Sequence, residues 1–300
     1  MSRSSRDNSP DERIELPYLL PSRSNCEAAL PAQSAQRAGA DDRDHEVIEG
    51  CQVRGRGLER EHFHSLPDSD VQTLTEIGIF RALEFNDLAR HRYHSDLIEA
   101  RKHLAKLSRA GLVRSRISYP ERAVYVTLTP AGHQYLATSP ERENSRQQLY
   151  HGFVKTREAR HDAALYRLYQ QESGRIERMG GRVRRIVLDF ELKHSINRRL
   201  ANLNSLSRAE QIRERRQIAQ DHGLRVVNGK ITLPDLRLEY EGPDQQLAKV
   251  DLELVTKHYH RGLLAARAKA GFAMYALAED AARLRPAMED PEIMQDILSL

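Results

Sequence analysis

The chain has 300 residues, of which 39% are hydrophobic and 30% charged, values typical of a soluble protein long enough for two compact domains. Its two cysteines form no Cys-x-x-Cys pair, which excludes a disulfide framework and a zinc finger. No segment reaches the roughly 18 to 20 apolar residues of a membrane span, so we expect a cytoplasmic protein that contacts no membrane.

The net charge of +4 is unevenly distributed. Lys and Arg outnumber Asp and Glu between residues 71 and 220, whereas the segments on either side are net acidic. Most of these cations are arginines, which make bidentate contacts to phosphate, so the distribution indicates a nucleic-acid partner. Solvated helix faces would give the same charge, and charge alone leaves both interpretations open.

Composition and periodicity predict the domain organisation. The N-terminal segment is rich in Ser, Arg, Asp, Pro and Gly and shows no sustained hydrophobic period, so we predict a disordered tail. Order is expected to begin near Asp70. The predicted parts are a tail at 1–66, an ordered domain at 67–140, a helical linker at 141–180, an α/β domain at 181–280 and a C-terminal helix at 281–300, capped by Asp290 and Pro291.

Three helices are predicted in the first ordered domain. Thr73 and Glu76 have the spacing of a capping box and predict the start of the first helix, and Asn86 is expected to cap the second. The third helix is expected to begin at Ser95, to carry apolar residues at helical spacing, and to end at Gly111.

Two strands follow these helices. Residues 112–118 and 123–128 alternate apolar and polar side chains on either side of a turn, and Thr129-Pro130 opens a further short helix. Three helices followed by a two-stranded ribbon resemble a winged helix-turn-helix domain. The segments that carry the resemblance are Leu104-Ala-Lys-Leu107 in the recognition helix, Gly111-Leu-Val113 at the wing entry and Val126-Thr-Leu-Thr-Pro-Ala-Gly132 at the wing's end.

This resemblance implies that the third helix enters the major groove of double-stranded DNA and that the wing lies along the backbone or minor groove. A winged helix that binds a protein is the alternative, because fold does not fix function. The density of basic residues favours DNA, and the frequent palindromy of such operators makes a homodimer an expected partner. The implied DNA-binding residues are Arg101, Lys102, His103, Lys106 and Arg109 on the helix and Arg114, Arg116 and Arg122 on the wing.

The second half combines helical and strand patterns, which predicts an α/β fold with at least three strands. Asn228-Gly229 is a strong hairpin signal, and Ser207 and Glu210 have the spacing of a capping box at the start of a helix. The expected elements are helices at 159–171, 191–203, 207–220 and 259–277, a strand at 182–190, a hairpin at 224–233, and strands at 234–240 and 249–255.

Acidic residues on these last two strands resemble the metal-binding pattern of restriction-endonuclease-like domains. Pro234-Asp235 and Asp251-Leu-Glu253, with Glu191 upstream, would form the carboxylate cluster. The resemblance implies that Asp235, Asp251 and Glu253 bind Mg²⁺, a hard cation that prefers oxygen ligands. The family's lysine is missing two residues beyond either acid, where Glu253 and Val255 stand, so Lys257 or Lys269 would have to replace it as a catalytic residue.

Three interpretations of the acidic strand therefore stay open: a nuclease site, a degenerate nuclease fold that binds DNA or protein, and a solvent-facing acidic surface without metal. The absence of a Gly-rich phosphate loop and of a Gly-x-Ser-x-Gly elbow disfavours a small-molecule enzyme.

From residue 70 to 277 the arrangement resembles the replication-relaxation family of plasmids and integrated mobile elements. The resemblance implies a winged-helix domain followed by a restriction-endonuclease-like α/β domain. It also implies a nucleoid-associated regulator, or an accessory factor in replication or transfer, with a metal-dependent endonuclease or nickase as the alternative.

Overall fold

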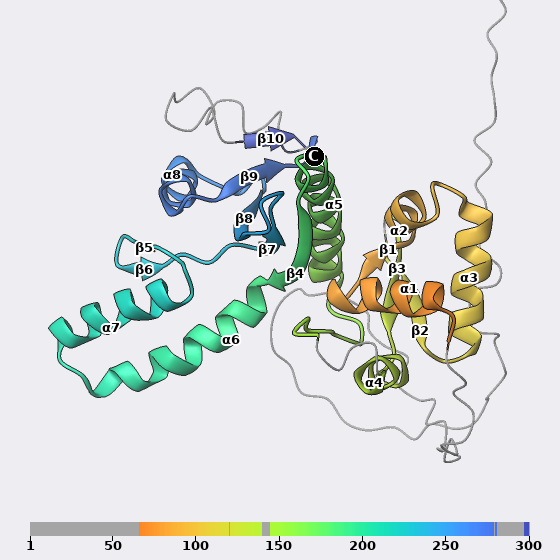
Figure 1. The fold of residues 1–300 in the computed structure, drawn as a ribbon, viewed down its shortest axis with the longest axis horizontal. Helices are drawn as coiled ribbons and strands as arrows, with labels where there is room; N and C mark the ends of the chain where they lie inside the picture. The colour runs from red at the N-terminus through yellow and green to blue at the C-terminus, as the bar shows by residue number, and fades with distance from the viewer. Residues whose placement is uncertain (1–65, 120, 140–144, 279, 281–296, 300) are drawn as a thin grey trace, which may run out of the picture. The chain divides into compact units, whose positions relative to one another are not determined.

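The computed structural model describes residues 66–119, 121–139, 145–278, 280 and 297–299, so the predicted disordered tail lies outside the described residues up to residue 65. The fold is a mixture of helices and several sheets, in agreement with the expected combination of α and β structure. The described residues from Asp68 onward belong to one compact unit, whose elements are labelled in Figure 1. None of the helices in these described ranges is long and apolar enough to cross a membrane.

Residues 68–138 fold into helices around a small antiparallel sheet of order β1-β3-β2. The short strand β1 was not predicted. It pairs with β3 through Leu83, which lies opposite Val126. The elements are α1 (Asp68–Ile79), β1 (Leu83–Glu84), α2 (Phe85–Arg92), α3 (Leu97–Arg109), β2 (Val113–Ile117), β3 (Val124–Leu128) and α4 (Pro130–Thr138).

The predicted starts of α1 and α2 were wrong. Helix α1 begins at Asp68, and Thr73 lies inside it, where its hydroxyl donates to the carbonyl of Ser69 at 2.9 Å. The N-cap of α2 is Glu84, without a side-chain hydrogen bond, rather than Asn86. Spacing alone identified polar residues near these helix starts but could not distinguish a cap from an internal hydroxyl.

The N-cap of helix α3 lies one residue later than the predicted Ser95, and the helix ends as predicted. The Asp96 side chain accepts hydrogen bonds from the backbone N–H groups of Ile98 and Glu99 and therefore caps the helix in place of Ser95. Gly111 follows the C-cap with a φ of 72°, a left-handed conformation that glycine adopts without strain. The residues that α3 buries are Ala100, Leu104 and Leu107.

The end of the ribbon and the start of α4 are held together by hydrogen bonds. The Thr129 hydroxyl accepts from Gly132 N and donates to the carbonyl of Gly111 at 2.6 Å, so Thr129 is the predicted N-cap. A Cβ atom at Gly132 would lie only 2.1 Å from the carbonyl oxygen of Leu112. The glycine of the Leu-Thr-x-x-Gly stretch is therefore required because any side chain at that position would clash with the backbone of Leu112.

Helix α5 (Thr156–Arg178) is longer than the predicted 159–171 and contacts both halves of this unit. Tyr166 is fully buried, stacks edge-on against Phe80, and donates from its hydroxyl to Glu76 at 2.7 Å. Near the other end of α5, Glu172 accepts from the Tyr275 hydroxyl at 2.6 Å. The segment expected as a linker thus includes a packed core helix, which runs beside β4 in Figure 1.

The second half contains a five-stranded mixed sheet of order β10-β9-β8-β7-β4. The predicted capping box at Ser207 and Glu210 is confirmed, as is the hairpin turn at Asn228-Gly229, where both residues have positive φ. The elements are β4 (Arg182–Leu188), α6 (Asp189–Leu200), η2 (Ala201–Ser205), α7 (Arg208–Asp221), β5 (Val226–Val227), β6 (Lys230–Ile231), β7 (Leu236–Glu241), β8 (Leu247–Val255), α8 (Arg261–Ala270), β9 (Ala273–Ala276) and β10 (Ile297–Ser299).

The single long helix predicted at 259–277 was wrong. Helix α8 ends at Ala270, because Gly271 takes a left-handed conformation with a φ of 82°. The apolar residues that follow form β9, which pairs parallel to β8 inside the sheet. The expected C-terminal helix at 281–300, with its start at Asp290, lies outside the described residues as far as 296. At its end the prediction was wrong, because residues 297–299 form strand β10, which pairs with β9.

Candidate functional site

The basic residues of α3 occupy two different environments. Ile98, Lys102, Ala105 and Arg109 recur at steps of about one helical turn on the side away from the buried residues, and we call them the outer stripe. Lys102 and Arg109 are exposed, whereas Arg101 is half-buried, with an Nε that has no hydrogen-bond partner in the described part of the chain. The outer stripe therefore presents two of the predicted DNA-binding cations to solvent.

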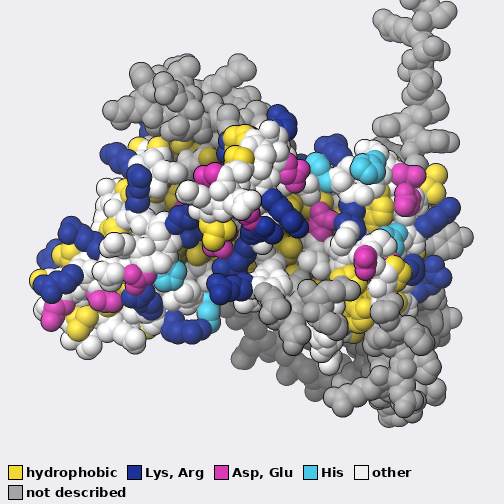
Figure 2. Space-filling model, viewed as in Figure 1, with side chains coloured by type: hydrophobic (Ala, Val, Ile, Leu, Met, Phe, Trp, Pro, Cys, Tyr) yellow, Lys and Arg dark blue, Asp and Glu magenta, His cyan; other side chains and the backbone are white. Residues whose placement is uncertain are grey.

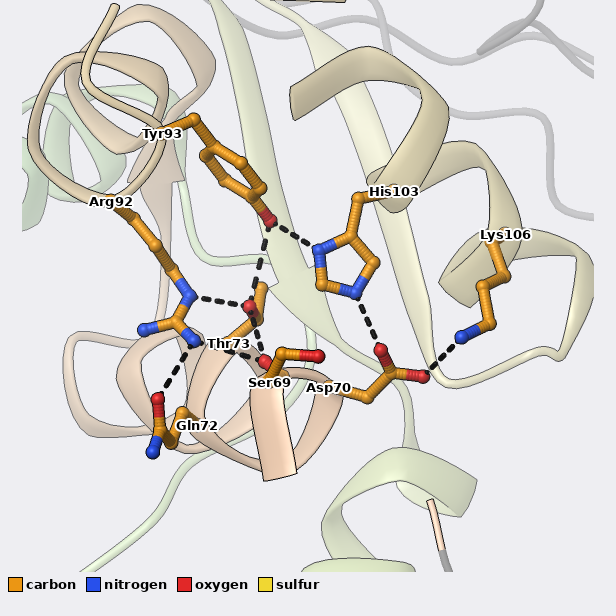
Figure 3. A network of polar contacts seen from close by, with 8 residues as sticks. All are labelled: Ser69, Asp70, Gln72, Thr73, Arg92, Tyr93, His103 and Lys106. Carbon is orange, nitrogen blue, oxygen red and sulfur yellow. Dashed lines mark hydrogen bonds and ion pairs between the residues drawn. The ribbon is translucent and has the colours of Figure 1, made fainter. Parts of the chain in front are cut away.

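His103 and Lys106 instead bind a buried carboxylate of α1 (Figure 3). Asp70 is 2% exposed, and its two oxygens lie 2.8 Å from His103 Nε2 and 2.7 Å from Lys106 Nζ. Burial of this carboxyl raises its pKa, but the hydrogen bonds and charges of Lys106 and His103 outweigh burial and lower the pKa below its ordinary value. Two predicted DNA contacts are thus engaged within the protein, where they fix α3 to α1.

The same network joins α2 to these helices. Tyr93 contacts His103 Nδ1 through its hydroxyl at 2.8 Å, and Arg92 donates to the Thr73 hydroxyl and to the carbonyl of Ser69. Figure 3 shows these side chains converging between the helices. The orientation of α3 therefore depends on polar contacts as well as on its apolar face.

The ribbon formed by β2, β3 and their loop also presents cations. The guanidinium groups of Arg114 and Arg116 lie over the ring of Phe153, at 4.9 and 5.0 Å from its centroid. Both side chains are exposed, and Arg122 is exposed at a loop position with a φ of 56°. Stacking on Phe153 restricts two arginines and leaves their N–H groups able to donate to phosphate. In the view of Figure 2, Lys and Arg side chains lie on the surface over α3 and over α6 and α7.

Two of the predicted metal-binding acids are neighbours: Asp235 directly precedes β7, and Glu253 lies on the paired strand β8. Glu253 is fully buried; its Oε1 accepts from the Tyr259 hydroxyl at 2.6 Å and lies 2.7 Å from Arg267 Nε. Its Oε2 has no hydrogen-bond partner among the described residues. Asp235 accepts from Leu254 N at 3.0 Å, and its other oxygen is 3.8 Å from His161 Nε2. We call Asp235 and Glu253 the acid pair.

Proximity and burial disfavour simultaneous ionisation of the acid pair. Burial, followed by the charge of Asp235, raises the pKa of Glu253 to about 8. Burial also raises the pKa of Asp235, although the charge of His161 acts in the opposite direction. At neutral pH the pair therefore holds a proton, which a bound cation would displace.

Asp251, the third predicted metal ligand, has a different partner. Arg237 lies opposite it on β7 and makes a bidentate contact, with distances of 2.6 and 2.9 Å between nitrogen and oxygen atoms. Both side chains are largely buried, so the acidic face of β8 is not the solvent-facing surface considered from sequence. Glu191 likewise forms an ion pair with Arg185. Within the ranges that the structure describes, no three His, Cys, Asp or Glu side chains are placed to hold one metal ion.

Among the described residues, neither predicted catalytic lysine forms a hydrogen bond or ion pair with the acid pair. Lys257 is exposed in the turn after β8, and Lys269 is exposed in the last turn of α8. The cation that contacts Glu253 is Arg267, two residues before Lys269. Sequence reasoning missed Arg267 and Arg237 because both pairings depend on packing between separate elements.

A cationic cleft of about 1020 Å³ lies beside the acid pair, between the start of α5, α6 and the end of β8. His161, which faces Asp235, is part of its lining. The side chains of Lys155, Arg157 and Lys257 also line the cleft and make no hydrogen bond or ion pair with any described residue. The cleft thus offers uncompensated positive charge next to two buried carboxyl groups.

Comparison with known proteins identifies no relative of this chain. It matches no protein-family model, no curated protein and no solved structure. The likeness to the replication-relaxation family therefore rests on the sequence motifs alone.

Proposed function

We propose that residues 68–138 form a winged-helix domain and that the protein binds double-stranded DNA. The observation that carries this proposal is the outer stripe of α3, where Lys102 and Arg109 lie opposite the buried face of the helix. The order of elements supports it, since three helices precede the ribbon that carries Arg114 and Arg116.

In the proposed complex α3 enters the major groove and the ribbon follows the phosphate backbone. Asp70 positions α3 by holding His103 and Lys106, so the groove receives the outer stripe rather than those two residues. Arg114 and Arg116, restricted by Phe153, bind phosphate with less loss of side-chain freedom than unrestrained arginines would. We extend the proposal to a homodimer on a palindromic site and to regulation, replication or transfer of a mobile element.

A matched pair of double variants tests this interface. Lys102→Ala with Arg109→Ala should weaken binding of a fluorescent duplex by at least about ten-fold and reduce the salt slope by about 1 for each lost phosphate contact. Arg178→Ala with Lys230→Ala removes the same two residue types, and Arg178, like Arg109, binds a carbonyl of its own helix. Equal affinities of the two variants would contradict the proposed interface.

A metal-dependent DNA endonuclease or nickase is the second candidate function, favoured by the acid pair beside the cationic cleft. Asp235 and Glu253 would hold Mg²⁺, because this ion is usually bound by one or two carboxylates together with substrate phosphate. The unpartnered Oε2 of Glu253 fits such a site. Bound Mg²⁺ would supply Lewis-acid chemistry at the phosphodiester.

Supercoiled plasmid distinguishes the two candidates on one gel, with Mg²⁺ or EDTA and with or without SDS. Nicking that requires Mg²⁺ and disappears in Asp235→Ala would establish the nuclease. Retardation that SDS abolishes, without nicked or linear DNA, would support a binding protein whose second half does not cleave. The control is Asp244→Ala, which removes an exposed acid from the loop between β7 and β8.

A further inference from the structure

We infer that Ile98, at the start of α3, contacts a thymine methyl group in the major groove and so selects sites with an A·T pair at that position. This inference rests on the proposed DNA-binding function and assigns one element of its sequence preference. The structural basis is the position of Ile98 on the outer stripe, four residues before Lys102.

The fold does not account for an isoleucine at this position. Its side chain is 64% exposed, whereas Ala100, Leu104 and Leu107 are at most 1% exposed and form the buried face of α3. The backbone of this first turn is held by Asp96, which accepts from the N–H groups of Ile98 and Glu99 at 3.0 and 2.9 Å. Ile98 is thus a large apolar side chain on a fixed backbone, directed away from the core.

Its surroundings indicate the kind of partner. A single exposed apolar residue is ordinary on a protein surface. Here, however, the neighbouring Leu97 is also exposed, at 38%. Lys102 and Arg109 lie on the same stripe as Ile98, so the surface combines apolar groups with cations. A polyanion that also carries apolar groups complements this combination.

Duplex DNA is such a partner. The C5-methyl group of thymine is the apolar group of the major groove, and residues near the start of a recognition helix contact base edges there. Asp70 holds His103 and Lys106 on the side of α3, so Ile98 and Lys102 are the outer-stripe side chains of its first half, where Leu97 and Glu99 are also exposed. Ile98 would therefore face a base edge while the cations bind phosphate or guanine.

Deoxyuridine substitution tests the contact, because uracil differs from thymine only by the missing methyl group. The full chain is first used to select its preferred duplex from a randomised library. Each thymine is then replaced singly by deoxyuridine, and dissociation constants are measured by fluorescence anisotropy for the native chain, Ile98→Ala and Ile212→Ala. Ile212 is the matched control, an exposed isoleucine on α7.

At one or two positions the native chain and Ile212→Ala should each lose about four-fold in affinity, the effect expected for one buried methyl group. Ile98→Ala should bind the thymine duplex more weakly and show no further loss with deoxyuridine. Methyl-independent binding by the native chain, or full discrimination by Ile98→Ala, would overturn the inference while leaving DNA binding intact. A chain that selects no duplex would overturn the proposed function and this inference together.

Discussion

Gly132 joins the ribbon to α4 at a point where the backbone of Leu112 leaves no space for a side chain. A Cβ atom there would lie 2.1 Å from a carbonyl oxygen, which cannot move without breaking the junction that Thr129 caps. A Cβ atom at Gly174, near the C-terminal end of α5, would meet no other atom within 4 Å outside the helix's own backbone. A side chain at position 132 would therefore clash with the backbone, whereas one at position 174 would not.

Gly132→Ala should lower the free energy of unfolding by about 1–3 kcal/mol or more, because the methyl group would overpack the junction. Gly174→Ala should raise it by about 0.5–1 kcal/mol, since alanine restricts the unfolded chain and favours helix. Urea denaturation of both variants measures these values. Destabilisation of similar size in both would show that packing at Gly132 is not the cause.

Glu253 makes stability depend on pH. Its pKa is raised in the folded protein from an ordinary value of 4.5 to about 8, first by burial and then by Asp235. Its contribution to stability is therefore fully present below about pH 4.5 and is lost as the pH rises through about 8. Between about pH 5 and 9 the native chain should lose stability on the order of a few kcal/mol from this group.

Glu253→Gln, which keeps an oxygen for the Tyr259 hydroxyl, should flatten this dependence. Urea midpoints at several pH values measure it. Parallel curves for the native chain and the variant would contradict the assignment of a raised pKa to Glu253.

At the scale of elements, Asp70 attaches α3, the helix proposed to enter the DNA groove, to α1. Its carboxylate is buried between His103 and Lys106, so Asp70→Asn should cost about 1.5–3 kcal/mol of stability through lost charge-assisted hydrogen bonds. Because the pKa of Asp70 is lowered, this contribution is present above its ordinary pKa and is lost as the pH falls through the folded value.

Asp68→Asn, an exposed change in the same first turn, serves as the control for Asp70→Asn and should cost at most about 1 kcal/mol. Differential scanning calorimetry near neutral pH compares the two variants. A similar effect of both would show that the Asp70 contacts do not hold α3.

Local signals predicted the elements that depend on neighbouring residues. The turn at Asn228-Gly229, the capping box at Ser207 and the helix end at Gly111 are each fixed within a few residues of sequence. Strand β9 escaped prediction because its identity depends on pairing with β8, and an alanine-rich segment before it favours helix. The single helix predicted at 259–277 therefore merged the segment that forms α8 with the one that forms β9.

The residues of the candidate site also differ in whether local sequence could predict their positions. Helical periodicity predicted the apolar face of α3, and Ala100, Leu104 and Leu107 are buried as that spacing requires. Which basic residues lie opposite this face follows from the same spacing, but the prediction did not separate Lys102 and Arg109 from the other cations. Periodicity could not predict that Asp70 would bind His103 and Lys106, since this requires α1 to pack on α3. The pairing of Asp251 with Arg237 likewise depends on the register between β7 and β8.

At the scale of the whole molecule, α5 connects the proposed DNA-binding elements to the sheet that carries the acid pair. Arg81, which follows α1, makes a bidentate contact with Asp162 of α5, and Glu172 farther along the helix binds Tyr275 of β9. The cationic cleft is lined both by Arg81, which follows α1, and by residues at the end of β8, such as Leu254. DNA binding is therefore best measured on the full chain rather than on a fragment.

The most direct test of the central claim is the affinity of the full chain for a fluorescent duplex, measured by anisotropy across a series of salt concentrations. Binding through several Lys and Arg contacts to phosphate predicts that log K falls linearly with log salt concentration, with a slope of about −3 or steeper. Absence of binding at low salt, or an affinity independent of salt, would contradict the claim that this protein binds double-stranded DNA.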